Sequence, residues 1–148
     1  MKYHIVLLVI LTCTCQNTPN PLPSEVAVTQ THVAIHAIER VEVRAVSFGI
    51  STWGSITCDK FDKAFTGTDM EFHVLTDKQL LLEVASHLSD LKPTTDKSSL
   101  DTRAKAVIFY QDNSIKTLCI DQFTMEYDGK RVKNDNVLLR LLKIKTDY

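Results

Sequence analysis

Residues 104–132 read AKAVIFYQDNSIKTLCIDQFTMEYDGKRV, and this stretch decides the fold class. Apolar and polar residues alternate in it with a period of two, which is typical of half-buried β-strands. Asp128-Gly129 is the dipeptide most typical of a tight hairpin turn. The predicted strands are residues 104–110, 115–123, 124–127 and 130–132. Tandem strands joined by short turns predict an antiparallel meander.

Two further strands are predicted upstream of this meander. Apolar residues occupy alternate positions over residues 33–45, and the pattern is clearest over residues 38–47. A shorter alternation at residues 70–74 predicts another strand, with His73 on its polar side. Residues 56–65 fit either a short strand or a single helical turn, and the sequence leaves both alternatives open.

Two helices complete the predicted fold. Residues 76–79 have the spacing of a capping box, with Thr76 as N-cap and Gln79 at the third helical position. Pro93 ends the apolar run that follows at helical spacing, which comprises Leu81, Val84, Ala85, Leu88 and Leu91. Residues 134–136 are suited to cap a C-terminal helix. The expected fold is α+β, an antiparallel β-sheet meander with two helices packed on one face.

The composition is that of an ordinary globular protein. The 148 residues are 44% hydrophobic and 24% charged, with four glycines and four prolines. These values exclude collagen-like, low-complexity and wholly disordered classes. Lys and Arg total 17 against 18 Asp and Glu, so the formal charge is −1. Because no strong positive field is present, no nucleic-acid partner is expected.

The first fifteen residues have the layout of an export signal. Lys2 precedes an uninterrupted apolar run over residues 5–11. Seven residues in a helix cover about 10 Å, whereas the hydrocarbon core of a bilayer is about 30 Å thick. We therefore expect a secretory signal peptide in residues 1–15 rather than a membrane-spanning helix.

The end of the apolar run resembles the signal of bacterial lipoproteins. Leu11-Thr12-Cys13-Thr14-Cys15 is followed at once by polar residues. In that family the cysteine directly after the apolar run is acylated and becomes the first residue of the mature protein. The resemblance implies a lipid (palmitate) anchor on Cys15, with Cys13 as the alternative, and attachment to a membrane of the cell envelope. Thr14 departs from the pattern, which usually has Gly, Ala or Ser before the cysteine.

The rest of the chain divides into a tether and one domain. Residues 16–24 contain three of the four prolines, which favours an extended spacer. Residues 25–148 are expected to form the single α+β domain. The alternative to lipidation is ordinary signal cleavage after Cys15, which would release a freely secreted protein.

Cys58 and Cys119 are the remaining cysteines. In an oxidising compartment they could form a disulfide, and the alternative is two small buried thiols. A catalytic pair of one such thiol with His73 or His87 is formally available. Cys119, however, lies between two apolar residues of a strand pattern, which favours a structural role.

No motif of a common enzyme class is present. The sequence lacks a glycine-rich phosphate loop, a Gly-x-Ser-x-Gly elbow and a His-Glu-x-x-His zinc motif. His32 and His36 could share a metal ion with Glu39 only on a helix. The alternation there predicts a strand, in which about 13 Å separates the two histidines. We therefore expect no catalytic residues, no metal and no cofactor.

Trp53 is the candidate binding residue. It is the only tryptophan, and it lies in a predicted loop between Gly49 and Gly54. Tryptophan is enriched at interface hot spots, although a loop tryptophan can also fold back as a lid over a sheet edge. The sequence predicts a membrane-tethered, exported, non-enzymatic domain that binds a protein or peptide, with an inhibitor or immunity-type role as one version. The alternatives are a small exported thiol-dependent hydrolase or redox protein, and a structural envelope component.

Overall fold

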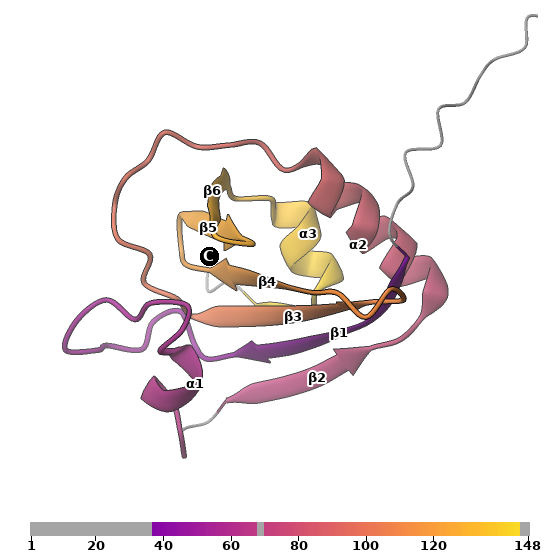
Figure 1. The fold of residues 1–148 in the computed structure, drawn as a ribbon. Coiled ribbons are helices and arrows are strands. Elements are labelled where there is room, and N and C mark those ends of the chain that lie inside the picture. The colour runs from indigo at the N-terminus through magenta and orange to yellow at the C-terminus, as the bar shows by residue number, and fades with distance from the viewer. Residues whose placement is uncertain (1–36, 68–69, 146–148) are drawn as a thin grey trace, which may run out of the picture. The chain divides into compact units, whose positions relative to one another are not determined.

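The computed structural model describes residues 37–67 and 70–145 (Figure 1). The predicted signal segment, both candidate acylated cysteines and the predicted tether lie outside the described residues, as do His32 and His36. The described chain is α+β, with a six-stranded antiparallel sheet and three helices. Among these residues no helix has the length and apolar character needed to span a membrane.

The six strands are arranged in the order β2-β1-β3-β4-β5-β6 (Figure 1). Their bounds are β1 Ile38–Ala45, β2 Glu71–Leu75, β3 Ala104–Tyr110, β4 Ile115–Ile120, β5 Thr124–Tyr127 and β6 Lys130–Lys133. Strands β3 to β6 form the predicted meander, and every pairing is antiparallel. The topology departs from a simple meander at β2. Strand β2 follows β1 in the chain and pairs with the edge of β1 that is not paired with β3, so the chain must then cross over β1 to reach β3.

Turn chemistry sets the ends of the last strands. Strand β4 ends at Ile120, three residues before the predicted end. The reason is Asp121, whose carboxylate accepts hydrogen bonds from the backbone N–H groups of Phe123 (2.7 Å) and Thr124 (2.6 Å). These bonds replace the strand pattern by a turn. At the next turn both Asp128 and Gly129 have positive φ, 49° and 74°, as a two-residue hairpin turn of type I′ requires.

The helices are α1 (Phe61–Ala64), α2 (Lys78–Asp90) and α3 (Asn136–Leu141). Helix α1 settles the open alternative at residues 56–65 in favour of a single turn. The predicted cap of α2 is wrong by one residue, since Asp77 rather than Thr76 accepts the hydrogen bond from Leu80 N–H, at 2.9 Å. Asp77 is still extended, so its carboxylate reaches the third helical N–H.

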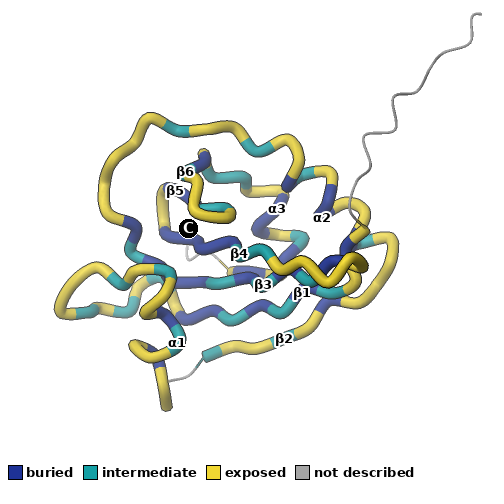
Figure 2. Tube along the Cα trace, viewed as in Figure 1, coloured by how far each residue is buried: buried dark blue, intermediate teal, exposed yellow. Residues whose placement is uncertain are grey.

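The main core joins buried residues of the sheet with buried residues of the two longer helices. Buried residues alternate along β1 and β3 (Figure 2). Their side chains join a cluster with the apolar residues of α2 and α3. We call the side of the sheet that carries these buried residues the inner face, and the opposite side the outer face. A second, smaller core of Val46, Phe61 and Phe65 packs under α1.

Strand β2 faces the opposite way from the prediction. Leu75 pairs with Val41 and is buried, so the period of two places His73 on the inner face as well. A hydrogen bond of 2.8 Å joins His73 Nε2 to the carbonyl oxygen of Leu142. Phe72 and Val74 therefore lie on the outer face, where they are 55% and 43% exposed.

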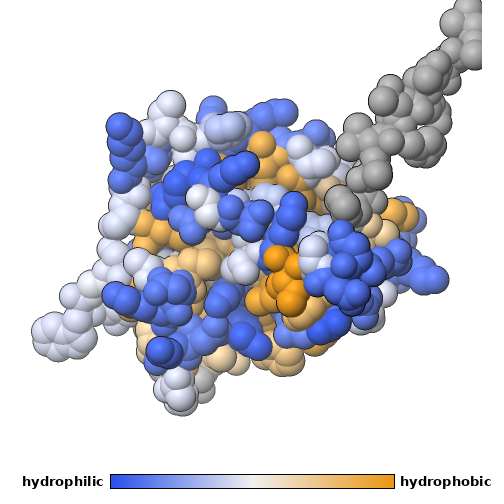
Figure 3. All heavy atoms as spheres, viewed as in Figure 1, coloured by the Kyte–Doolittle hydropathy of each residue, from blue (hydrophilic) through white to orange (hydrophobic). Residues whose placement is uncertain are grey.

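The two edges of the sheet differ. Residues 92–94 cover β6, because Lys133 N–H donates to the Lys92 carbonyl (2.8 Å) and Thr94 N–H donates to the Arg131 carbonyl (3.2 Å). The start of the segment that follows helix α2 thus extends the sheet. Figure 3 shows an apolar patch over the strands, bordered by hydrophilic residues.

Candidate functional site

Trp53 projects fully into solvent. Its relative exposure is 110%, so the side chain is as accessible as in an extended peptide. The alternative in which it folds back as a lid over the sheet edge is therefore wrong. A free indole surface of this size is a feature of binding sites rather than of folding cores.

The Trp53 loop, residues 47–58, is held from beneath by Arg103. This guanidinium donates hydrogen bonds to the Ile50 carbonyl (3.3 Å) and to Thr52 Oγ1 (3.1 Å). Arg103 is only 6% exposed. Asp101 neutralises it with two short contacts, 2.7 Å to Nη1 and 2.6 Å to Nη2. A planar guanidinium bonded in this way has little freedom to move.

Further hydrogen bonds fix the two sides of Trp53. Before it, Thr52 Oγ1 donates across the tip to the Gly54 carbonyl at 2.8 Å. After it, Ile56 N–H donates to Asp101 Oδ1 at 2.8 Å, and Thr102 N–H donates to the Ile56 carbonyl at 2.7 Å. The loop therefore presents Trp53 from a backbone whose neighbouring residues are already ordered.

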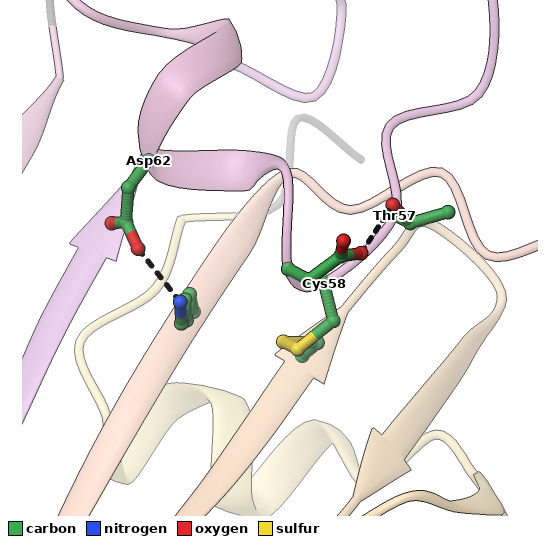
Figure 4. Close-up of a disulfide and its surroundings, with 6 residues drawn as sticks. Thr57, Cys58 and Asp62 are labelled. Atoms are coloured by element: carbon green, nitrogen blue, oxygen red, sulfur yellow. Dashed lines mark hydrogen bonds and ion pairs between the residues drawn. A yellow bond between two sulfur atoms is a disulfide. The ribbon is translucent and has the colours of Figure 1, made fainter.

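A disulfide between Cys58 and Cys119 attaches the end of this loop to strand β4 (Figure 4). Their Cα atoms are 5.6 Å apart and 61 positions separate them in the sequence. Cys119 is fully buried and lies on the outer face, opposite Lys105 of β3. The pairing that the sequence left open is thus formed in this structure, where neither sulfur is a thiol.

Ion pairs attach helix α1 to the same outer face. Asp62 accepts hydrogen bonds from Lys105 Nζ (2.7 Å) and Arg44 Nη1 (3.0 Å), and Figure 4 draws one of the two as a dashed line from Asp62. Burial alone would raise the pKa of Asp62, but the two cations outweigh it and lower that pKa below its ordinary value. Asp62 is therefore an anion at neutral pH and holds α1 by charge.

A cleft of about 570 Å³ lies beside the disulfide. Its walls come from the end of the Trp53 loop, the segment 98–100 and the outer face of strands β3 to β6. The charged residues that line it are Asp59, Lys105, Glu126 and Arg131. Because both signs are present, the cleft has no net preference for an anion or a cation. The hydroxyls of Ser55 and Ser99, 3.1 Å apart, connect its rim to the Trp53 loop.

The predicted alternatives for chemistry are not assembled at this site. His73 contacts the Leu142 carbonyl, and His87 Nδ1 lies 2.9 Å from Asp135 Oδ2, at the N-cap of α3. Neither histidine is near the disulfide cleft. Within residues 37–67 and 70–145, no group of three or more side chains is placed to hold a metal ion.

The sequence singles out Trp53 as a candidate but not the residues that position it. Arg103 and Asp101 read as polar residues at the end of a loop, and nothing in their spacing signals a buried ion pair. The surrounding residues carry one usable signal, the two glycines that bracket the tryptophan.

Comparison with known proteins gives no relative. The chain matches no family model, and no curated protein or solved structure matches it significantly.

Proposed function

We propose that this protein is a binding module whose Trp53 loop docks onto another protein at the cell envelope. The observation that carries this proposal is a fully exposed tryptophan on a loop fixed by a buried arginine. Leaving an indole in water is unfavourable by an amount on the order of 2 kcal/mol relative to burial. A partner that covers Trp53 recovers this free energy.

The order of the loop strengthens the proposal. Binding normally requires that loops and side chains lose conformational freedom, and each ordered side chain costs about 0.5–1.5 kcal/mol. The contacts of Thr52, Ile56 and Cys58 have already restricted the loop before a partner arrives. Trp53 can then serve as a convex anchor for a concave pocket on the partner.

The envelope location belongs to the same proposal. The disulfide supports an exported protein, since such bonds persist in oxidising compartments and are rare in the cytosol. The lipoprotein-like segment at Cys15 would hold the domain at a membrane surface. Anchoring would raise its effective concentration toward other envelope proteins.

A thiol-dependent hydrolase has less support. That mechanism needs a thiolate nucleophile, and Cys58 and Cys119 are consumed in the disulfide. The alternative would first require reduction of this bond by an external dithiol.

Affinity capture with mild cross-linking tests the proposal. The full-length protein, expressed in its native host with a C-terminal tag, is captured from envelope extract beside Trp53→Ala and Phe123→Ala. Phe123 is the matched control, because it is also an exposed aromatic residue, 73% accessible, but lies at the turn between β4 and β5.

We expect one stoichiometric protein with the wild type and with Phe123→Ala, and a loss of at least about tenfold with Trp53→Ala, equivalent to about 1.4 kcal/mol. Equal recovery with all three proteins would contradict the role of Trp53. Recovery of lipid without protein would assign the exposed indole to the membrane interface instead.

A further inference from the structure

We infer that the cleft beside the disulfide is the second part of the interface that Trp53 begins, and that it takes an extended peptide segment without net charge from the same partner. This inference rests on the proposed function and names the chemistry of the partner. A tryptophan buries about 150–250 Å², whereas a standard protein interface buries about 800 Å² on each side. Trp53 therefore needs further contact surface close to it.

The cleft begins where the Trp53 loop ends. Thr57 and Cys58 line it, and the four residues from Trp53 to Thr57 span at most about 14 Å of extended chain. Ser99 also lines the cleft and is joined to Ser55 of the loop by a hydrogen bond of 3.1 Å. The disulfide fastens this wall of the cleft to β4. A partner of standard size that covers Trp53 therefore reaches the cleft as well.

The size of the cleft and its unused hydrogen-bonding groups fit a stretch of peptide. Its volume is about 570 Å³, which is within the range of about 300–1,000 Å³ typical of ligand sites. Glu126 and Arg131 are register partners on β5 and β6, yet no ion pair joins their side chains in the described structure. Arg131 donates to Thr124 Oγ1 instead, at 2.7 Å, and Glu126 has no hydrogen-bond partner among residues 37–67 and 70–145. A peptide N–H can donate to this carboxylate, and a peptide carbonyl can accept from the remaining N–H groups of the guanidinium.

The charges around the cleft disfavour other classes of ligand. Glu126 and Asp59 would repel a phosphate or another anion. The hydrogen bond from the Thr57 hydroxyl lowers the pKa of Asp59, which is therefore an anion at neutral pH. Lys105 and Arg131 would in turn repel a metal ion or another cation. A peptide group has a donor and an acceptor but no net charge, so neither pair of side chains opposes it.

Photo-cross-linking of the full-length protein in intact cells tests this inference. A photoreactive phenylalanine is placed at position 53, 98 or 82, one position in each protein. Ser98 is exposed and lines the cleft, whereas Leu82 is 60% exposed on α2 and does not line it. We expect adducts to one and the same protein from positions 53 and 98 and none from position 82. The segment of the partner reached from position 98 must have no excess of acidic or basic residues.

A charge reversal tests whether the cleft and Trp53 act as one interface. Glu126→Arg is compared with Glu83→Arg, which makes the same change on the exposed surface of α2. With the photoreactive group at position 53, we expect the yield of adduct to fall at least about tenfold for Glu126→Arg and to be unchanged for Glu83→Arg. The adduct from position 98, formed without any charge reversal, covers the case in which Glu126→Arg fails to fold.

The outcomes separate this inference from the proposed function. No adduct from position 53 would contradict the proposed function, and this inference with it. Four results would overturn the inference alone: an adduct from position 53 but none from position 98, a different protein or a strongly charged segment at position 98, the same adduct from position 82, or equal yields for the two charge reversals.

Discussion

At the scale of single residues, the conformational order of the Trp53 loop depends on Arg103. Its guanidinium is buried, neutralised by Asp101 and bonded to two loop residues, Ile50 and Thr52. Arg103→Met keeps much of the side-chain volume but removes these hydrogen bonds. We expect a loss of about 1–3 kcal/mol in the free energy of unfolding. We also expect faster amide hydrogen exchange over residues 50–56 and weaker partner capture although Trp53 remains.

Arg44→Met is the control for that experiment. Arg44 is a partly exposed arginine that bonds to Asp62 of α1 and not to the Trp53 loop. Unchanged exchange over residues 50–56 in Arg103→Met would show that the loop is ordered by other contacts.

Asp62 predicts how stability depends on pH. Its pKa in the folded protein is lowered because Lys105 and Arg44 outweigh the effect of burial. A lowered pKa contributes stability that is present above the unfolded pKa of about 4 and is lost as the pH falls through the folded pKa. The carboxylate is 39% exposed, so we expect its contribution at neutral pH to be only about 1 kcal/mol.

Denaturant unfolding of wild type and Asp62→Asn between neutral pH and about pH 2 checks this. We expect Asp62→Asn to be less stable at pH 7 and the difference to shrink below about pH 4. A difference that stays constant through the acid range would show that the ion pairs of Asp62 do not stabilise the folded state.

Residue identity alone points to only part of this candidate site. Trp53 could be found because a lone tryptophan between two glycines is unusual, but whether it points outward depends on Arg103 far along the chain. The cap of α2 shows the same limit at short range. Thr76 and Asp77 both suit an N-cap, and the choice is made by backbone geometry where β2 ends.

At the scale of elements, the hairpin between β5 and β6 gives a direct test. Gly129 has a φ of 74°, which an alanine adopts only with strain. Gly54 has nothing within 4 Å of an added Cβ and does not have a positive φ. We therefore expect Gly129→Ala to lower the free energy of unfolding by about 1 kcal/mol, and Gly54→Ala to be near neutral. Thermal or denaturant unfolding of both variants measures this, and equal effects would contradict the turn assignment.

The disulfide is the second test at this scale. It closes a loop with a sequence separation of 61 and connects the end of the Trp53 loop to β4. In the chain-entropy description such a loop contributes about 4 kcal/mol. We expect the double variant Cys58→Ser, Cys119→Ala to unfold at a markedly lower temperature than wild type. We also expect amide hydrogen exchange to become faster near α1 than in the rest of the sheet.

Alkylation of the two cysteines provides the control, because it reports whether they are joined in the disulfide. Without reductant, Cys58 and Cys119 of the unfolded wild-type protein should resist alkylation, and a reducing agent should expose both. Rapid alkylation without reductant would revive the thiol-dependent alternative.

The pattern of residues predicted most elements because alternation and turn dipeptides act locally. Strands β3 to β6 and helix α2 follow from the period of apolar residues, from Asp128-Gly129 and from Pro93. The orientation of β2 could not be predicted this way. Its alternation puts two apolar residues, Phe72 and Val74, on one face and only Leu75 on the other, and yet Leu75 is the residue that is buried, as the register partner of Val41. The one-turn helix α1 depends on non-local contacts of Phe61 and Asp62.

At the scale of the described fold, the two faces of the sheet differ in what they contact. The inner face, together with buried residues of α2 and α3, supplies most of the core. The outer face carries the disulfide, the α1 ion pairs and the cleft, and its β2 edge bears exposed apolar residues. Binding is therefore expected on the outer side and on the loop attached to it, while substitutions on the inner face should act through stability alone.

Photo-cross-linking in intact cells tests the central claim most directly. Trp53 of the full-length protein is replaced by a photoreactive aromatic residue, with the same replacement at Phe123 as the control. The account predicts one discrete adduct to another protein from position 53 and none of that mass from position 123. An absence of protein adducts from position 53, or the same adducts from both positions, would contradict the claim that Trp53 anchors a protein partner.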